Sequence, residues 1–272
     1  MSRIKACFEQ LKADGQTALI TYITAGDPEP WVTVPMLHAL VDAGANILEL
    51  GVPFSDPMSD GPIIQKACER ALKNDVSLHN VLDMVRQFRE KDNETPIVLM
   101  GYANPLEAMG YKAFAEKAKE SGVDGVLTVD MPPEEADDFL LEMNDKDIDT
   151  IFLVAPTTSP ERMAKISEYA KGFIYYVSIK GVTGTATLDV SEVAEKMELL
   201  KQYTDLPLGV GFGIRDGKSA AAVSKVSDAV VVGSTLVRCI EEHVDKPEEL
   251  PAALAGLLAE MRHAINAQDM AK

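Results

Sequence analysis

Residues 97–129 read IVLMGYANPLEAMGYKAFAEKAKESGVDGVLTV and contain an apolar run, a helical pattern and a second apolar run. The two runs, Ile97–Tyr102 and Val126–Val129, are nearly continuous in hydrophobicity, as are the strands of a parallel sheet buried on both faces. The segment between them, Pro105–Ser121, opens with a proline, which is a common start of a helix. The stretch therefore predicts two parallel strands joined by a covering helix.

The same unit repeats along the chain. Apolar runs predict strands at Leu19–Thr24, Ile47–Leu50, Ile97–Tyr102, Val126–Val129, Ile151–Val154, Phe173–Ser178, Leu208–Phe212 and Ala229–Val232. Helical patterns between them include Trp31–Ala45, Leu78–Lys91, Pro105–Ser121, Pro133–Lys146, Pro160–Lys171, Val190–Tyr203 and Gly217–Ser227. Eight such units predict an α/β protein with the (β/α)8 or TIM barrel fold. An open doubly wound sheet is the structural alternative.

The two ends of the chain add a helix each. Ile4, Phe8 and Leu11 have helical spacing before the first strand, so we expect an extra N-terminal helix that closes the bottom of the barrel. A last helix is expected over Leu250–Ile265. No linker, low-complexity run or shift in composition divides the sequence, so residues 1–272 are expected to form one domain.

Two of the segments that connect successive predicted strands contain more residues than the others. They follow the second and the sixth strand, and they contain the segments Gly51–Pro62 and Ile179–Asp189. The active site of a (β/α)8 barrel lies where the strands end. Both segments are therefore expected to be long active-site loops, or lids.

The charge balance excludes some classes of partner. The chain has 26 Lys and Arg against 43 Asp and Glu, which gives a formal net charge of −17. This sign disfavours binding to nucleic acid and to anionic membranes. Three separated cysteines, no signal-peptide pattern and no apolar stretch of membrane-spanning length predict a cytoplasmic location.

Several common site motifs are missing. The four histidines fall in helical or helix-flanking segments, and there is no paired-histidine metal motif, phosphate-binding Walker loop or dinucleotide fingerprint. Metal, ATP and nicotinamide chemistry are therefore disfavoured. Acid–base catalysis would fall to carboxylates or tyrosines.

The second predicted strand supplies the first candidate. Glu49 lies inside the apolar run Ile47–Leu50, where burial would raise its pKa toward a value useful to a general acid or base. An ion pair with a covering helix is the structural alternative. The loop that follows contains Asp56 and Asp60, and each is also ordinary turn chemistry. The residues alone do not separate the two aspartates.

Glycine loops follow the last three predicted strands, at Gly181–Gly184, Gly211–Ile214 and Gly233–Thr235. Glycine lets main-chain N–H groups approach an anion, and Ser234 would open a helix whose dipole favours negative charge. Together they predict a phosphate site that needs no lysine. Three ordinary turns are the alternative.

Aromatic residues end several strands. Only one of Tyr175 and Tyr176 can face the barrel interior, because side chains alternate along a strand. Tyr22, Tyr102 and Phe212 end the first, third and seventh predicted strands. They would either line a flat apolar pocket or pack in the core.

These motifs resemble the tryptophan synthase α subunit family. The resemblance is carried by Leu48–Pro57 and Asp60–Pro62, by Tyr175 with Ser178, and by the three glycine loops. It covers nearly the whole chain. The loop after the second strand is its most specific part, because the glycine loops are shared with other phosphate-binding barrels.

The resemblance implies retro-aldol cleavage of indole-3-glycerol phosphate to indole and glyceraldehyde 3-phosphate, with no metal or cofactor in this subunit. It implies that Glu49 is the general acid/base, that Asp60 accepts the indole N–H, and that Tyr175 belongs to the catalytic site. The substrate-binding residues that it implies, together with the aromatic and loop positions above, are Tyr22, Met100, Tyr102, Leu127, Thr183 and Phe212. The implied phosphate-binding residues are Gly184, Gly213, Gly233 and Ser234.

The resemblance also implies a partner, a β subunit that carries pyridoxal phosphate in an α2β2 complex. Contacts are expected from the loop after the second strand, from Asn104–Glu107 and from the loop after the sixth strand. Tyr22, Met100 and Ile179-Lys180 depart from residues common in the family, Phe, Leu and Arg-Ser. The alternatives are a free-standing indole-3-glycerol-phosphate lyase, another phosphate-binding barrel aldolase such as a Schiff-base enzyme that uses Lys180, and a non-catalytic scaffold.

Overall fold

The computed structural model describes residues 2–178, 190–211 and 213–271. Its centre is a closed barrel in which eight parallel strands pair in chain order, from β1 to β8 and back to β1. The strands are β1 Ala18–Thr24, β2 Ile47–Gly51, β3 Ile97–Gly101, β4 Gly125–Thr128, β5 Asp149–Val154, β6 Ile174–Val177, β7 Leu208–Gly211 and β8 Ala229–Val232. The predicted (β/α)8 barrel is confirmed, and the open sheet is excluded.

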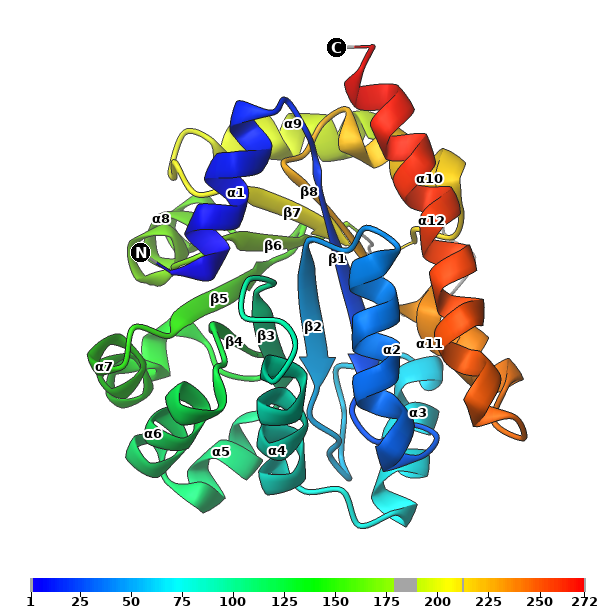
Figure 1. Ribbon diagram of the computed structural model, residues 1–272. Coiled ribbons are helices and arrows are strands. Elements are labelled where there is room, and N and C mark those ends of the chain that lie inside the picture. The colour runs from blue at the N-terminus through cyan, green and yellow to red at the C-terminus, as the bar shows by residue number, and fades with distance from the viewer. Residues whose placement is uncertain (1, 179–189, 212, 272) are drawn as a thin grey trace.

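Helices surround the barrel (Figure 1). They are α1 Arg3–Ala13, α2 Pro30–Asp42, α3 Pro62–Lys73, α4 Leu78–Arg89, α5 Ala103–Met109, α6 Tyr111–Ser121, α7 Asp137–Asp145, α8 Pro160–Tyr169, α9 Val190–Leu200, α10 Gly217–Ser224, α11 Ser234–Glu242 and α12 Leu250–Asp269. Short 3-10 turns precede α7 and α12, at Pro133–Glu135 and Pro247–Glu249.

Two predicted helices are divided. The helix expected over Pro105–Ser121 is α5 and α6, which meet at Gly110 with a φ of 83° that a helix does not contain. The helix expected over Pro133–Lys146 starts as the 3-10 turn and continues as α7. The long step after β2 contains α3 as well as α4, so its loop is confined to residues 52–61.

Strand alternation separates two cores. Outward side chains such as Leu48, Leu99 and Tyr176 pack beneath the helices in the larger cluster. Inward side chains such as Ile47, Val98 and Leu127 fill the barrel in a second cluster. The barrel is therefore solid, and only the ends of its strands are open to a substrate.

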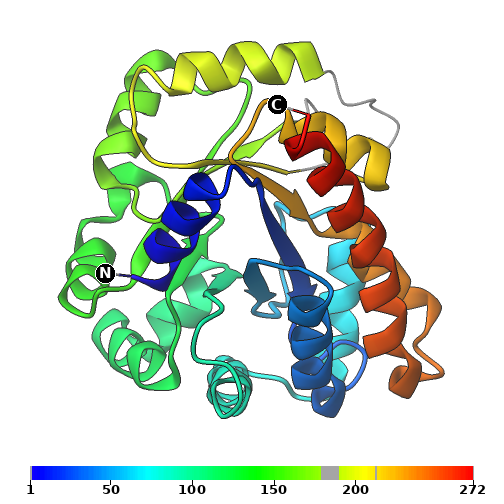
Figure 2. The ribbon, with the colours of Figure 1, turned by 45° about the horizontal axis from the view of Figure 1, so that its top comes forward.

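Helix α1 closes the bottom of the barrel, as predicted. Its buried face, Ile4, Phe8 and Leu11, belongs to the same cluster as the inward strand residues. The helix crosses the end at which the strands begin (Figure 2). The opposite end, which we call the mouth, is therefore the open one.

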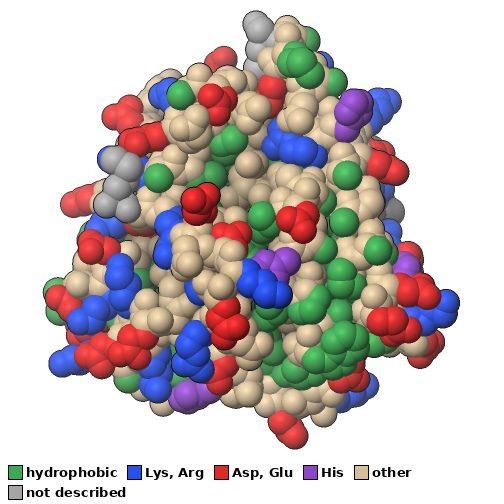
Figure 3. Space-filling view, in the orientation of Figure 1, with side chains coloured by type: hydrophobic (Ala, Val, Ile, Leu, Met, Phe, Trp, Pro, Cys, Tyr) green, Lys and Arg blue, Asp and Glu red, His purple; other side chains and the backbone are tan. Residues whose placement is uncertain are grey.

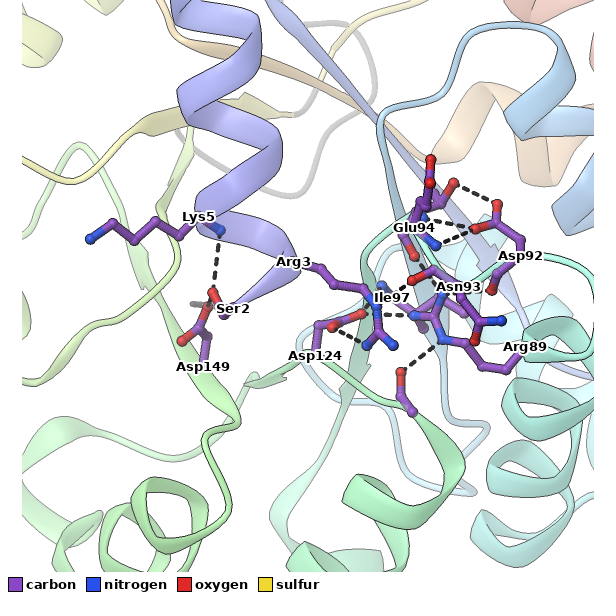
Figure 4. A network of polar contacts seen from close by, with 12 residues as sticks. Ser2, Arg3, Lys5, Arg89, Asp92, Asn93, Glu94, Ile97, Asp124 and Asp149 are labelled. Carbon is purple, nitrogen blue, oxygen red and sulfur yellow. Dashed lines mark hydrogen bonds and ion pairs between the residues drawn. The ribbon is translucent and has the colours of Figure 1, made fainter.

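Ion pairs fasten α1 to the barrel. Arg3 and Arg89 each place a nitrogen 2.8 Å from a different oxygen of Asp124, and Ile97 N donates to the same carboxylate at 2.8 Å. Ser2 Oγ donates to Asp149 at 2.6 Å. Figure 4 shows these residues converging from α1, α4 and the starts of β3 to β5. The network stabilises the bottom of the barrel, at the end opposite to the mouth.

The surface carries charges of both signs. In Figure 3, acidic and basic side chains alternate over the described residues of this face, without a continuous basic area. Hydrophobic side chains gather over the beginning of α2, where Trp31 is 58% exposed. None of the helices in the described part of the chain combines the length and hydropathy needed to cross a membrane.

Candidate active site

Glu49 is buried in the middle of β2 and faces the barrel interior, where it pairs in register with Tyr22 of β1. The residue is 1% exposed, and in the described part of the chain neither carboxylate oxygen has a hydrogen-bond partner. Burial raises the pKa of Glu49 to about 8. No ion pair to Glu49 is found among the described residues, so the structural alternative that the sequence left open is not supported. An unpaired carboxylic acid of this kind is suited to donate a proton near neutral pH.

Asp60 lies near the end of the loop after β2 and contacts Tyr102, the residue that follows β3. The hydroxyl of Tyr102 donates to Asp60 Oδ2 at 2.8 Å. Burial raises the pKa of Asp60, and the hydrogen bond from Tyr102 lowers it. Asp56 differs, because it is exposed and its carboxylate, among the described residues, accepts only from its neighbour Ser55, at 2.5 Å. The structure thus separates the two aspartates and favours Asp60 as the functional one.

Tyr22 and Met100 face the barrel interior, as Glu49 does. Tyr22 is buried in a small cluster with Ala67 and Val237, and Met100 packs against that cluster. The Tyr22 hydroxyl is 3.2 Å from Thr24 Oγ1, so its polar atom has a partner inside an apolar region. Leu127 pairs with Met100 in register and is fully buried. These side chains are suited to line a pocket for a flat apolar ring.

Tyr175 is the tyrosine of β6 that faces inward, packed against the interior cluster, whereas Tyr176 lies beneath the helices. Burial raises the pKa of Tyr175, and the charges of Glu49 and Asp60 raise it further. Tyr175 therefore remains a neutral hydroxyl near both carboxylates.

The loops after β7 and β8 are joined. Gly213 has a φ of 81°, a left-handed conformation that favours glycine. Gly233 is the N-cap residue of α11, and Ser234 is its first residue, as predicted. Thr235 Oγ1 donates to the carbonyl of Ile214 at 2.8 Å, which fixes one loop against the other. A helix start beside a glycine turn is suited to bind a phosphate group.

Some predicted residues lie outside the described ones. These are Thr183, Gly184 and Phe212, with the lid segment Ile179–Asp189 and the alternative nucleophile Lys180. The described site therefore consists of the two carboxylates, the aromatic and apolar lining, and the β7 and β8 loops. Among described residues, no group of three His, Cys, Asp or Glu side chains could hold a metal ion.

Sequence reasoning missed two contributions. Thr24 gives the Tyr22 hydroxyl a partner, and Thr235 ties the two phosphate-side loops together. The period-two alternation along β1 offered a signal for Thr24, because residues 22 and 24 point to the same face. Nothing in the local sequence indicated that Thr235 would reach Ile214.

The comparisons with known proteins agree along the whole chain. The family model described as tryptophan synthase alpha chain matches residues 8–266. The tryptophan synthase alpha chain of Thioalkalivibrio sulfidiphilus is 60% identical over 98% of this chain and 100% of its own length. That of Nitrosococcus oceani is 57% identical over 99% of both chains.

Solved structures have the same architecture. Tryptophan synthase subunit alpha of Legionella pneumophila superposes with a TM-score of 0.92 at 45% identity, over 98% of this chain and 99% of that one. A chain of tryptophan synthase from M. tuberculosis in its aminoacrylate-bound form has a TM-score of 0.86 at 34% identity, over 97% of this chain and 100% of that one.

Proposed function

Because this chain belongs to the tryptophan synthase alpha chain family, it is a lyase that cleaves indole-3-glycerol phosphate to indole and glyceraldehyde 3-phosphate in tryptophan biosynthesis, and we propose that Glu49 and Asp60 perform the proton chemistry. The observation that supports this proposal most strongly is the buried, unpaired carboxyl group of Glu49, and this burial raises its pKa to about 8. That group is protonated at neutral pH, as the first step requires.

The cleavage needs one proton added to C3 of the indole ring and one proton removed from the glycerol hydroxyl. Glu49 donates its proton to C3 of the indole ring, and the positive charge that develops is shared with N1. Asp60 accepts the N1–H hydrogen bond and stabilises this cation. The bond from C3 to the glycerol carbon then breaks, and its electron pair restores the aromatic ring. The same glycerol carbon becomes an aldehyde when its hydroxyl proton returns to Glu49, so protons and electrons balance.

The lining residues would orient the substrate for these steps. We propose that the indole ring and the glycerol chain are enclosed by the side chains of Tyr22, Met100, Tyr102, Leu127 and Tyr175, with Thr183 and Phe212. Gly213, Gly233 and Ser234, with Gly184, would bind the phosphate. The start of α11 supports this assignment, because main-chain N–H groups there have no partner within the helix.

The family implies a β-subunit partner. We propose an α2β2 complex in the cytoplasm, in which residues 1–272 fold as one domain without a cofactor and pyridoxal phosphate is held by the β subunit. The loop after β2, the segment Asn104–Glu107 and the loop after β6 would contact that subunit. All three follow strand ends at the mouth, so indole would leave directly toward the partner.

The test is indole release from indole-3-glycerol phosphate, measured with and without an added β subunit. Glu49→Gln and Asp60→Asn should fold normally and lose at least about 100-fold in kcat. Glu90→Gln, which removes an exposed carboxylate at the end of α4, is the matched control and should behave as the wild type. Turnover by Glu49→Gln at the wild-type rate would refute the assignment. Fast release without the β subunit would indicate a free-standing lyase instead of a partnered subunit.

A further inference from the structure

Asp60 lies near the end of a partly exposed loop, yet its proposed task requires a fixed carboxylate. Within the loop, its backbone N–H donates to Pro57 O at 3.0 Å, which orients the main chain alone. The one hydrogen bond to its side chain in the described part of the protein comes from Tyr102. The other carboxylate oxygen, Oδ1, has no partner among the described residues. What holds this side chain is therefore a single tyrosine that directly follows the neighbouring strand β3.

Tyr102 is itself held firmly. It directly follows β3 as the N-cap residue of α5, and the residue is 3% exposed. Its ring stacks on Phe54, with 5.3 Å between the ring centroids. Phe54 lies near the beginning of the loop after β2, so the ring fastens that part of the loop to β3.

The hydroxyl of Tyr102 fastens the other end of the loop. It accepts a hydrogen bond from Ser59 N at 3.0 Å and donates its proton to Asp60 Oδ2 at 2.8 Å. Because the Ser59 N–H occupies the acceptor side, the hydroxyl proton is directed to Asp60. One buried side chain thus fixes both the loop backbone and the orientation of the carboxylate.

We infer that Tyr102 is a positioning residue for the cleavage: it holds Asp60 Oδ2, so that Oδ1 is presented to the indole N–H. This inference rests on the proposed role of Asp60. It goes beyond lining of the pocket, because a lining role needs only the ring, whereas positioning needs the hydroxyl. The two roles therefore separate in a variant that keeps the ring.

The charge state of Asp60 follows from the same contact. Burial raises the pKa of Asp60, and donation from Tyr102 opposes that rise by stabilising the carboxylate. Burial and the Asp60 charge raise the pKa of Tyr102, so the phenol keeps its proton across the working range. Removing the hydroxyl should therefore raise the pKa of Asp60.

The test is Tyr102→Phe, assayed for indole release by the full chain across pH. We expect kcat to fall by about 10- to 100-fold with little change in KM, as for loss of a hydrogen bond to a charged group. We also expect the acid limb of the pH profile, which reports Asp60, to move upward by about one to two pH units. The alkaline limb, which reports Glu49, should stay in place. Tyr111→Phe is the matched control, because Tyr111 donates to Glu107 at 2.8 Å in a similar but exposed pair.

A second variant separates the outcomes. In an Asp60→Asn background, Tyr102→Phe should cause little further loss, because the carboxylate that it positions is gone. If Asp60→Asn is inactive while Tyr102→Phe keeps both the wild-type kcat and the wild-type acid limb, the positioning role is wrong and the proposed function stands. If Asp60→Asn keeps wild-type activity, the proposed role of Asp60 fails, and the positioning role fails with it. A Tyr102→Phe protein that unfolds at a lower temperature but keeps the acid limb would show a purely structural role.

Discussion

The ring of Tyr22 on β1 lies directly over Gly51 on β2, so closely that a Cβ atom at Gly51 would overlap the tyrosine hydroxyl. The same arrangement recurs across the barrel, where a Cβ at Gly211 would overlap the hydroxyl of Tyr175. Each tyrosine occupies the space that a glycine on the next strand leaves free. Both pairs place a tyrosine ring inside the barrel near Glu49.

Gly51→Ala should therefore disturb the site. The added methyl group would have to displace the Tyr22 ring, and overpacking of this kind costs about 1–3 kcal/mol of unfolding free energy. We expect that loss in urea denaturation, together with a raised KM for indole-3-glycerol phosphate. Adding Tyr22→Phe to Gly51→Ala should recover only part of the lost unfolding free energy, because the ring carbon Cζ would still lie 2.7 Å from the new Cβ. Unchanged stability and KM in Gly51→Ala would show that the Tyr22 ring moves freely.

The raised pKa of Glu49 also predicts how stability depends on pH. The folded chain keeps this proton up to about pH 8, whereas the unfolded chain releases it near the ordinary glutamate pKa of 4.5. Between these values the folded state binds more protons, so this group makes the unfolding free energy fall as pH rises. Glu49→Gln lacks the effect. Its stability relative to wild type should grow by about 1.4 kcal/mol per pH unit between pH 5 and 7, measured by urea denaturation. A difference that does not change with pH would contradict the buried, protonated state, and Glu90→Gln provides the baseline.

Loss of the charge at Asp124 should destabilise the protein at the bottom of the barrel. Its carboxylate pairs with both Arg3 and Arg89, and Arg89 is 8% exposed at its side chain. Removing one partner of a buried ion pair leaves an uncompensated charge, which costs about 3–5 kcal/mol. Asp124→Asn should therefore lower the unfolding free energy by about that amount.

Arg3→Gln is the comparison for this network, because the Arg3 side chain is 36% exposed. Its loss should cost no more than about 1 kcal/mol. Thermal and urea unfolding measure both variants. Equal effects of the two substitutions would show that the buried pair of Asp124 with Arg89 stabilises the protein no more than the pair of Asp124 with Arg3.

A negative charge at the start of α11 should oppose phosphate binding. Ser234→Asp would place a carboxylate where the helix dipole and the glycine loops favour an anion. We expect KM for indole-3-glycerol phosphate to rise by at least about 10-fold with kcat little changed. Ser77→Asp adds the same charge at the N-cap of α4 and should leave KM unchanged. A wild-type KM in Ser234→Asp would place the phosphate elsewhere.

The architecture was accessible from the sequence because period and spacing encode it. Continuous apolar runs located every strand to within two residues at each end, and the amphipathic spacing of Ile4, Phe8 and Leu11 located the closing helix. The sequence does not predict the break between α5 and α6, because Gly110 lies within a continuous helical pattern. Helix capping at a glycine depends on backbone geometry that residue type alone leaves open.

The site was accessible in part. The position of Glu49 in an apolar strand indicated burial, and the structure confirms it. The choice between Asp56 and Asp60 was beyond local sequence, because it depends on Tyr102, 42 residues further along the chain. Contacts across strands of this kind, like that of Thr235 with Ile214, arise only when the barrel closes.

Isotope exchange at C3 of indole follows the proton that we assign to Glu49. Indole is incubated in deuterated water with glyceraldehyde 3-phosphate and the enzyme, and loss of the C3 proton signal is followed by NMR. The wild-type chain should exchange this proton through reversible formation of the C3 bond, whereas Glu49→Gln should exchange it at the rate of the enzyme-free solution. Exchange by Glu49→Gln at the wild-type rate would show that another group carries the proton.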